Sequence, residues 1–297
     1  MRERGSSDGP PPPSRGLSRR ALVGGAVGIA ALTAVGVPTI TALLDAPTGK
    51  LVTPLLAARP FYVAHRGGWR NWPEMSMEAY SNSVRRGVDA LEVSLARTSD
   101  GVWFGLHDRT LDRTSGTRGF VASEQTWAEV RKHTITAAAT DAPSQPARPY
   151  MTFGQLVKAY GTTHTIFVDP KWASPDHYSE LLELMDAAVA QPAQTFIAKA
   201  YCTGVEWAAA AASHGYLTWG YYYASEIAAS DALLPSTQEN WNLLGLDYDG
   251  STAAWASIRR YGKPVIGHVV PNKAAAETAM AKGATGLVVS GVVEVMG

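Results

Sequence analysis

The chain has 297 residues, of which 46% are apolar, so it can bury one large hydrophobic core. Basic and acidic residues number 26 each. The resulting formal net charge of zero gives no support to a nucleic-acid partner. The only cysteine is Cys202, which excludes an intramolecular disulfide framework.

The first 44 residues have the composition of an export or anchoring segment. Residues 1–16 are rich in Pro, Gly, Ser and Arg, which predicts a disordered cytoplasmic tail. Residues 17–44 place Arg19 and Arg20 before an uncharged run. Basic residues ahead of such a run are typical of a signal peptide or a transmembrane anchor, and the arginine pair is typical of twin-arginine export.

The uncharged run itself, residues 21–44, is long enough to cross a bilayer, which needs about 20 apolar residues. Positive charge stays on the cytoplasmic side, so we expect the rest of the chain to be exported. It would be extracellular after cleavage, or membrane-anchored through residues 21–44 without it. Residues 45–60 are then expected to form a short linker.

From residue 61 to 297, strand-like apolar runs alternate with helical stretches, which is typical of a parallel α/β architecture. The long section 109–150 is poor in periodic apolar runs and predicts an insertion at the rim. We therefore expect a TIM-type (β/α)8 barrel over 61–297. The strands are expected at 61–64, 90–95, 102–106, 163–171, 195–202, 217–224, 243–249, 264–270 and 286–290.

Polar residues stand at or near the ends of the first three of these runs. The residues are His65 and Arg66, then Glu92, then His107 and Asp108. A barrel builds its active rim from the ends of several strands, so this pattern favours a catalytic rim over solvent-facing strand ends.

Later strands add further candidates. The run 163–171 ends in Asp169 and Lys171, and Asp247 and Asp249 alternate at the end of the run 243–249. Lys199 lies inside an apolar run, where an unpaired ammonium is costly to bury. We therefore expect Lys199 to reach the barrel mouth or a carboxylate.

The segment 62–114 resembles the glycerophosphodiester phosphodiesterases, which belong to the phospholipase-C-like phosphodiesterases. Their pattern is H-R-G, P-E-N-T, E-x-D and H-D-x-x-x-x-R-T. The matching residues here, in the same order, are His65-Arg66-Gly67, Pro73-Glu74, Glu92 and His107-Asp108 with Arg113-Thr114. The sequence departs from the pattern at Met75, where the family has Asn, and at Ser94, where it has Asp.

The resemblance implies metal-dependent hydrolysis of glycerophosphodiesters or related lipid-derived phosphodiesters. His65 and His107 would be the acid–base pair, which suits side chains that titrate near neutral pH. Arg66 and Lys171 would hold phosphate oxygens. The divalent cation, Ca²⁺ or Mg²⁺, would bind Glu92 and Asp169, with Glu74 as a further candidate. In the family a glycerol hydroxyl of the substrate attacks phosphorus and forms a cyclic phosphate, which water then opens.

Ser94 removes one of three carboxylates from which the family builds its metal site. The metal then binds weakly, another carboxylate (Asp108, Asp247 or Asp249) fills the gap, or catalysis is lost. The retained histidines and cations favour an active enzyme. Two alternatives stay open: phospholipase-D-like or lyase activity on phospholipids, and a catalytically inactive phosphate- or lipid-binding barrel.

Overall fold

The computed structural model describes residues 49–136 and 145–297. The predicted tail over 1–16 and the predicted signal or anchor over 17–44 therefore lie outside the described residues. Within the described ranges, no helix combines the length and the hydropathy that crossing a bilayer requires.

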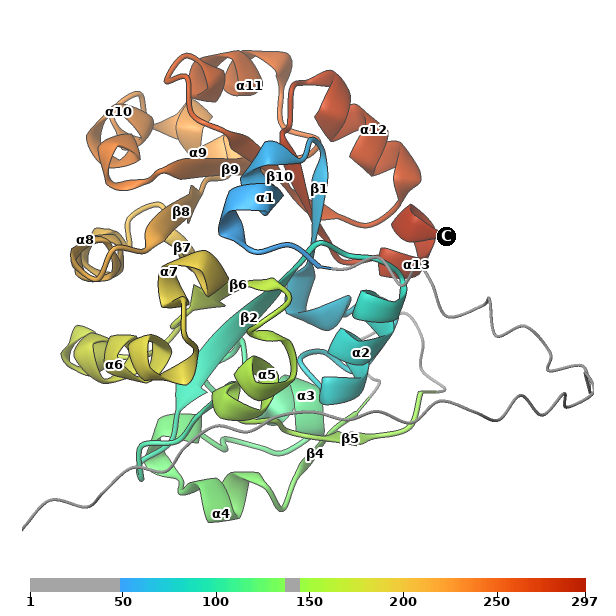
Figure 1. Ribbon diagram of the computed structural model, residues 1–297, viewed down its shortest axis with the longest axis vertical. Coiled ribbons are helices and arrows are strands. Elements are labelled where there is room, and N and C mark those ends of the chain that lie inside the picture. Colours follow the sequence, from blue (N-terminus) through green and yellow to red (C-terminus); the bar gives the residue numbers. More distant parts are fainter. Residues whose placement is uncertain (1–48, 137–144) are drawn as a thin grey trace, which may run out of the picture. The chain divides into compact units, whose positions relative to one another are not determined.

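Eight parallel strands of the described residues close into a barrel, which confirms the predicted fold class (Figure 1). Going round the barrel, β1 pairs with β11 on one side and with β2 on the other, so the sheet has no open parallel edge. The barrel strands are β1 (Phe61–Ala64), β2 (Ala90–Arg97), β6 (Thr165–Asp169), β7 (Phe196–Tyr201), β8 (Leu217–Tyr221), β9 (Leu243–Asp247), β10 (Val265–Val270) and β11 (Gly286–Val289).

Helices follow most of the barrel strands and cover the outside of the barrel (Figure 1). Their ends match local sequence signals: Ser76 caps the first turn of α2, and Thr152 forms a capping box with Gln155 at α5. The helices outside the rim are α2 (Met77–Arg85), α5 (Phe153–Tyr160), α6 (Tyr178–Ala188), α7 (Pro192–Thr195), α8 (Val205–Ser213), α9 (Ala224–Ala229), α10 (Leu233–Thr237), α11 (Thr252–Arg259), α12 (Lys273–Ala281) and α13 (Val292–Met296), with 3-10 turns η4 (Pro175–His177) and η5 (Gln238–Asn240).

The third predicted run does not become a barrel strand. It forms β3 (Trp103–Gly105), which pairs antiparallel with the far end of β2 through the turn at Asp100 and Gly101. This hairpin extends β2 beyond the barrel rim and places His107 over the mouth. The parallel barrel therefore passes directly from β2 to β6.

The region predicted as a rim insertion folds against this hairpin. It contains α3 (Asp112–Ser115), η2 (Ala122–Glu124), α4 (Trp127–Val130), β4 (Thr134–Ile135) and β5 (Arg148–Pro149). Phe104 of β3 packs on Trp127 and Tyr150, with ring centroids 5.5 and 5.9 Å apart. A small hydrophobic core separate from the barrel core, which also includes Leu106 and Leu111, thus supports the hairpin.

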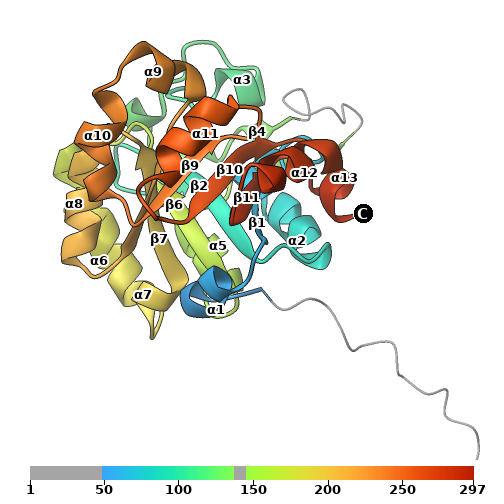
Figure 2. The same cartoon turned by 90° about the horizontal axis from the view of Figure 1, so that it is seen from above.

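The segment predicted as a linker contains helix α1 (Val52–Ala57). Val52 and Leu55 are buried and pack with inward-facing barrel residues such as Phe61 and Phe167. In Figure 2, α1 lies at the end of the barrel opposite α3 and α9. The prediction of a plain linker therefore fails at 52–57, because these residues bury apolar surface that would otherwise be open to water.

Replacing Leu55 with alanine is expected to lower the free energy of unfolding by about 2–5 kcal/mol, because it leaves a cavity at the closed end of the barrel. Thr53→Ala, on the exposed face of the same helix, is the control and is expected to change stability by less than about 1 kcal/mol. Urea unfolding of the full chain measures both. Equal, small effects would mean that α1 does not contribute to the barrel core.

Candidate active site

The first site residues lie in a left-handed turn at the end of β1. Arg66 has φ 50°, followed by Gly67 at 75° and Gly68 at 81°. Only glycine adopts this region without cost, and a Cβ at Gly67 would come within 2.9 Å of the Ala79 side chain in α2. The turn lets α2 pack closely and points the Arg66 backbone N–H at Glu92 Oε2, 2.8 Å away. A strained non-glycine residue of this kind is typical of a functional site.

A cavity of about 70 Å³ lies at the carboxyl ends of the strands. It brings together five residues that the sequence singled out, namely His65, Arg66, His107, Lys171 and Lys199. Its volume suits a group of a few heavy atoms, since one water occupies about 30 Å³ in the liquid. Two imidazoles and three cationic side chains around such a space can hold a phosphoryl group and move protons at its oxygens.

His65 is almost fully buried, and it accepts a hydrogen bond at Nδ1 from the indole N–H of Trp69, 3.2 Å away. Burial, together with the nearby charges of Arg66 and Lys199, holds its pKa well below the ordinary value of 6.5. His65 is therefore neutral at pH 7.

His107 is connected to Arg66 by a chain of charged side chains. Its Nδ1 lies 2.7 Å from Asp108 Oδ1, and Asp108 Oδ2 accepts from Arg113 Nε at 2.6 Å. Arg113 binds both oxygens of Glu74, at 2.8 and 2.9 Å. Glu74 in turn lies 3.6 Å from Arg66. Glu74, offered above as a metal ligand, thus orients two arginines.

The same chain sets the protonation of its members. Burial lowers the pKa of the His107 imidazole below 6.5, and the hydrogen bond with Asp108 only partly opposes this. The contacts with His107 and Arg113 hold the pKa of Asp108 far below its ordinary range. Asp108 therefore stays ionised and fixes the His107 ring, leaving Nε2 as the nitrogen able to exchange a proton.

The two carboxylates expected to bind metal lie behind the cavity. Glu92 is fully buried and Asp169 is nearly so. The Lys199 ammonium lies 2.6 Å from Glu92 Oε1 and 3.2 Å from Asp169 Oδ2, as the expectation of a carboxylate partner required. Lys171 Nζ also lies 3.2 Å from Asp169 Oδ2 and donates to the Tyr221 hydroxyl.

The remaining carboxylates do not fill the place of the missing acidic group at Ser94. Asp247 accepts a hydrogen bond from the Ala224 backbone at the start of α9, and Asp249 is exposed. Neither lines the cavity, and Asp108 is paired with His107 and Arg113. In the part of the chain that the structure describes, no three His, Cys, Asp or Glu side chains form a group able to hold a metal ion.

An aromatic wall completes the cavity, and the sequence did not single it out as part of the site. It consists of Trp219, Tyr221, Tyr223 and His268. Lys171 lies 4.9 Å from the Tyr221 ring centroid, and Lys199 lies 5.2 Å from the same ring, at distances typical of cation–π contacts. The alternation of aromatic residues at 219, 221 and 223 was the available signal, because side chains two apart in a strand share a face.

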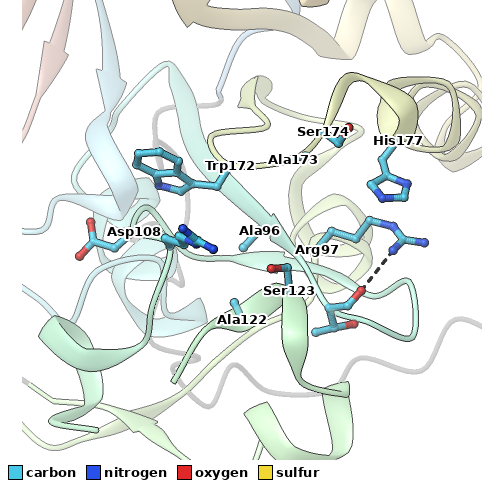
Figure 3. Close-up of a pocket in the computed structure, with 11 residues that line it drawn as sticks. Ala96, Arg97, Asp108, Ala122, Ser123, Trp172, Ala173, Ser174 and His177 are labelled. Carbon is cyan, nitrogen blue, oxygen red and sulfur yellow. Dashed lines mark hydrogen bonds between the residues drawn. The ribbon is translucent and has the colours of Figure 1, made fainter. Parts of the chain in front are cut away.

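A larger groove of about 370 Å³ adjoins the site between the β2–β3 hairpin, η2 and the loop after β6 (Figure 3). Asp108 lines it on the side of the site, and Arg97, Ser123 and His177 lie further along. Trp172 is 61% exposed, and its indole N–H donates to the His107 carbonyl at 2.9 Å. The groove offers room beside the small cavity for the rest of a substrate.

Residues 65–211 match the glycerophosphoryl diester phosphodiesterase family. The chain belongs to this family. Three residues of the motifs described above, His65, Arg66 and His107, lie within the matched residues and line the cavity.

Individual relatives are similar to this chain in sequence over limited stretches. Seventy-eight residues are 42% identical to the probable glycerophosphodiester phosphodiesterase 1 of Mycobacterium tuberculosis, covering 26% of this chain and 28% of that protein. The glycerophosphodiester phosphodiesterase of Bacillus subtilis is 28% identical over 156 residues, 50% of this chain and 51% of that protein. The alignments thus span from about a quarter to about half of these relatives.

Solved structures share the fold over most of the chain. A phosphodiesterase of Oleispira antarctica, in complex with its product sn-glycerol-3-phosphate, has a TM-score of 0.65 and 14% identity. The match covers 80% of this chain and 95% of that one. At this identity the likeness establishes the barrel fold only.

The departure of this chain from the family pattern at Met75 places a residue other than asparagine in a left-handed backbone conformation. Met75 has φ 52°, in the left-handed region, and its side chain is buried in the barrel core. Asparagine, the usual residue of the family pattern here, adopts this region more readily than most residues. The Met75 backbone is therefore strained, while its side chain packs in the barrel core.

Proposed function

We propose that this protein hydrolyses glycerophosphodiesters to an alcohol and a glycerol phosphate. The observation that carries the proposal is the cavity in which His65 and His107 share one small space with Arg66, Lys171 and Lys199. Family membership and the motifs in residues 65–211 support the same activity. The product named in the Oleispira antarctica complex is of the expected chemical class.

In the proposed mechanism, Arg66 and Lys171 bind the phosphoryl oxygens and neutralise their charge. The substrate's own glycerol hydroxyl attacks phosphorus and gives its proton to one histidine. The bond to the alcohol breaks, and the departing oxygen takes a proton from the other histidine. Water then opens the cyclic phosphate with the two roles exchanged, which returns both histidines to their starting protonation.

A divalent cation has no step in this mechanism, because the donor set does not fit Ca²⁺ or Mg²⁺. Ca²⁺ takes six to eight oxygen ligands, whereas Glu92 and Asp169 already bind an ammonium. Ser94 offers a hydroxyl that donates to Glu92 Oε1 at 3.2 Å, in place of the family's third carboxylate.

We expect the bell-shaped pH profile of kcat/KM to be centred below pH 6.5. This parameter reports the free enzyme, in which the mechanism needs one protonated and one neutral histidine. The pKa values of His65 and His107 are both lowered, so each loses its proton at a lower pH than a free histidine does. Initial rates between pH 4 and 9 measure the profile. A plateau that begins only above pH 7 would contradict the histidine assignment.

The first experiment measures release of alcohol from glycerophosphocholine, glycerophosphoethanolamine and glycerophosphoglycerol by the full chain. Turnover of at least one of them, lost in His65→Ala and His107→Ala, is the expected result. Turnover only of intact phospholipid would indicate phospholipase-D-like or lyase activity instead. Binding of glycerol phosphate without any turnover would identify an inactive phosphate-binding barrel.

We also propose that the barrel works outside the cytoplasm, anchored or exported through residues 17–44. The support is the sequence pattern of Arg19 and Arg20 ahead of the uncharged run. Fractionation of expressing cells tests it, with Arg19→Lys and Arg20→Lys together as the variant. Export that is unchanged in this variant would speak against the twin-arginine route.

A further inference from the structure

The Lys199 ammonium occupies the space between the carboxylates of a site that the family builds for a cation. Ser94 lies directly opposite Asp169 in the register of β2 and β6. Lys199 comes from the next strand, one residue beyond the paired Ala198, and is only 5% exposed. Its neighbours across β8 are Trp219 and Tyr221. Its ammonium thus contacts the two carboxylates of Glu92 and Asp169 and lies near the rings of β8.

The geometry leaves the Lys199 ammonium with N–H groups that make no hydrogen bond to Glu92 or Asp169. An ammonium has three N–H groups. The hydrogen bond to Glu92 Oε1 at 2.6 Å uses one of them, whereas Asp169 Oδ2, 3.2 Å away, is an ion-pair contact without a hydrogen bond. Because Lys199 also lines the cavity with Arg66 and Lys171, a remaining N–H is available to a phosphoryl oxygen there. A metal ion at the same place would serve that oxygen in the same way, as an electrophile fixed by carboxylates.

The neutral residue at 94 and the single charge of Lys199 together preserve the net charge of the site. A divalent cation held by three carboxylates leaves one net negative charge. An ammonium held by two carboxylates also leaves one net negative charge, so losing the acidic residue at 94 is balanced by replacing a doubly charged ion with a singly charged one. Buried charges are tolerated only when they are paired in this way.

We propose that Lys199 takes the place of the divalent cation, so that this protein hydrolyses phosphodiesters without a metal ion. The inference rests on the proposed function for its catalytic half. Its structural half, that the ammonium excludes the metal, stands on the positions of Lys199, Ser94, Glu92 and Asp169 alone.

The test has a binding arm and a turnover arm, both on the full chain. In the binding arm, isothermal titration with CaCl₂ or MgCl₂ is expected to show no binding to the wild type at millimolar concentrations. The double variant Ser94→Asp, Lys199→Ala restores three carboxylates and removes the ammonium. It is expected to bind Ca²⁺ or Mg²⁺ and to gain thermal stability when the ion is added.

In the turnover arm, wild-type activity is expected to be the same within about twofold in EDTA, Ca²⁺ or Mg²⁺. Lys199→Ala is expected to lose about 10²–10³-fold in kcat, as when one preorganised electrostatic donor is removed from other enzymes. Lys158→Ala, which removes an exposed lysine on α5, is the matched control and should leave kcat unchanged.

The outcomes separate the two proposals. Wild-type turnover that EDTA abolishes and Ca²⁺ or Mg²⁺ restores would overturn the role of Lys199 and leave the phosphodiesterase function standing. Absence of turnover under all conditions would refute the proposed function, and the titrations would then decide the inference. Metal binding by the wild type at micromolar concentration would overturn it in either case. If the double variant does not fold, Lys199→Met in the wild-type background, which keeps the chain length of lysine without its charge, replaces it in the titration.

Discussion

Replacing His107 with alanine is expected to lower kcat by about 10²–10⁴-fold on any glycerophosphodiester that the wild type hydrolyses, the usual contribution of a positioned general acid or base. The fold should survive, because the side chain is 27% exposed and its removal leaves no closed cavity in the barrel core. Circular dichroism and unfolding by urea check the fold beside initial rates.

The chain supplies a matched control for this variant. His214 Nδ1 lies 2.6 Å from Asp186 Oδ2, which is the same type of pair as His107 with Asp108, but His214 does not line the cavity. His214→Ala should therefore keep full activity. Asp108→Asn should give a smaller loss than His107→Ala, because the ring remains but its orientation and tautomer are no longer fixed. Wild-type kcat in His107→Ala would remove this residue from the mechanism.

Replacing Glu92 with alanine is expected to have the largest effect on stability. Glu92 is fully buried and binds Lys199, the Arg66 backbone N–H and the Ser94 hydroxyl. Removing one partner of a buried ion pair typically costs about 3–5 kcal/mol, since the other charge stays buried and less compensated. For a barrel of this size the melting temperature should fall by roughly 10 °C, and turnover should fall with it.

Two further variants show which interaction of Glu92 causes the loss of stability in Glu92→Ala. Glu92→Gln keeps an acceptor for the Arg66 N–H and loses only the charge, so it separates hydrogen bonding from ion pairing. Glu129→Ala removes an ion pair with Lys132 whose carboxylate is 47% exposed, and it should cost at most about 1 kcal/mol. A melting temperature of Glu92→Ala within 2 °C of the wild type would show that Lys199 finds sufficient compensation from Asp169 alone.

The barrel and the identity of most site residues could be predicted from the sequence, because they depend on local patterns. Period-two and apolar runs mark the strands, while His65 and Arg66 belong to the H-R-G motif and His107 to the H-D motif. The role of Glu74 could not be predicted, since it depends on Arg113 folding back from the rim insertion. Sequence spacing does not reveal that geometry.

Lys199 shows the same limit more sharply. A lysine inside an apolar run predicts some partner, and the expectation of a carboxylate is confirmed. Which carboxylates it meets depends on the register of β2, β6 and β7, three strands far apart in the sequence. Helix α1 could not be predicted for another reason. A six-residue helix that contains a proline has too few apolar positions to show a helical period, and its apolar residues are buried only by contact with the end of the barrel.

The position of β3 outside the barrel means that the two histidines are supported differently. His65 follows barrel strand β1, whereas His107 is carried by a two-stranded extension that packs on the barrel core through Trp103 and on the small cluster through Phe104. Such peripheral units open at lower free energy than the core they rest on. Mild denaturant should therefore inactivate the protein reversibly while the barrel is still intact, with amide exchange rising first in the hairpin.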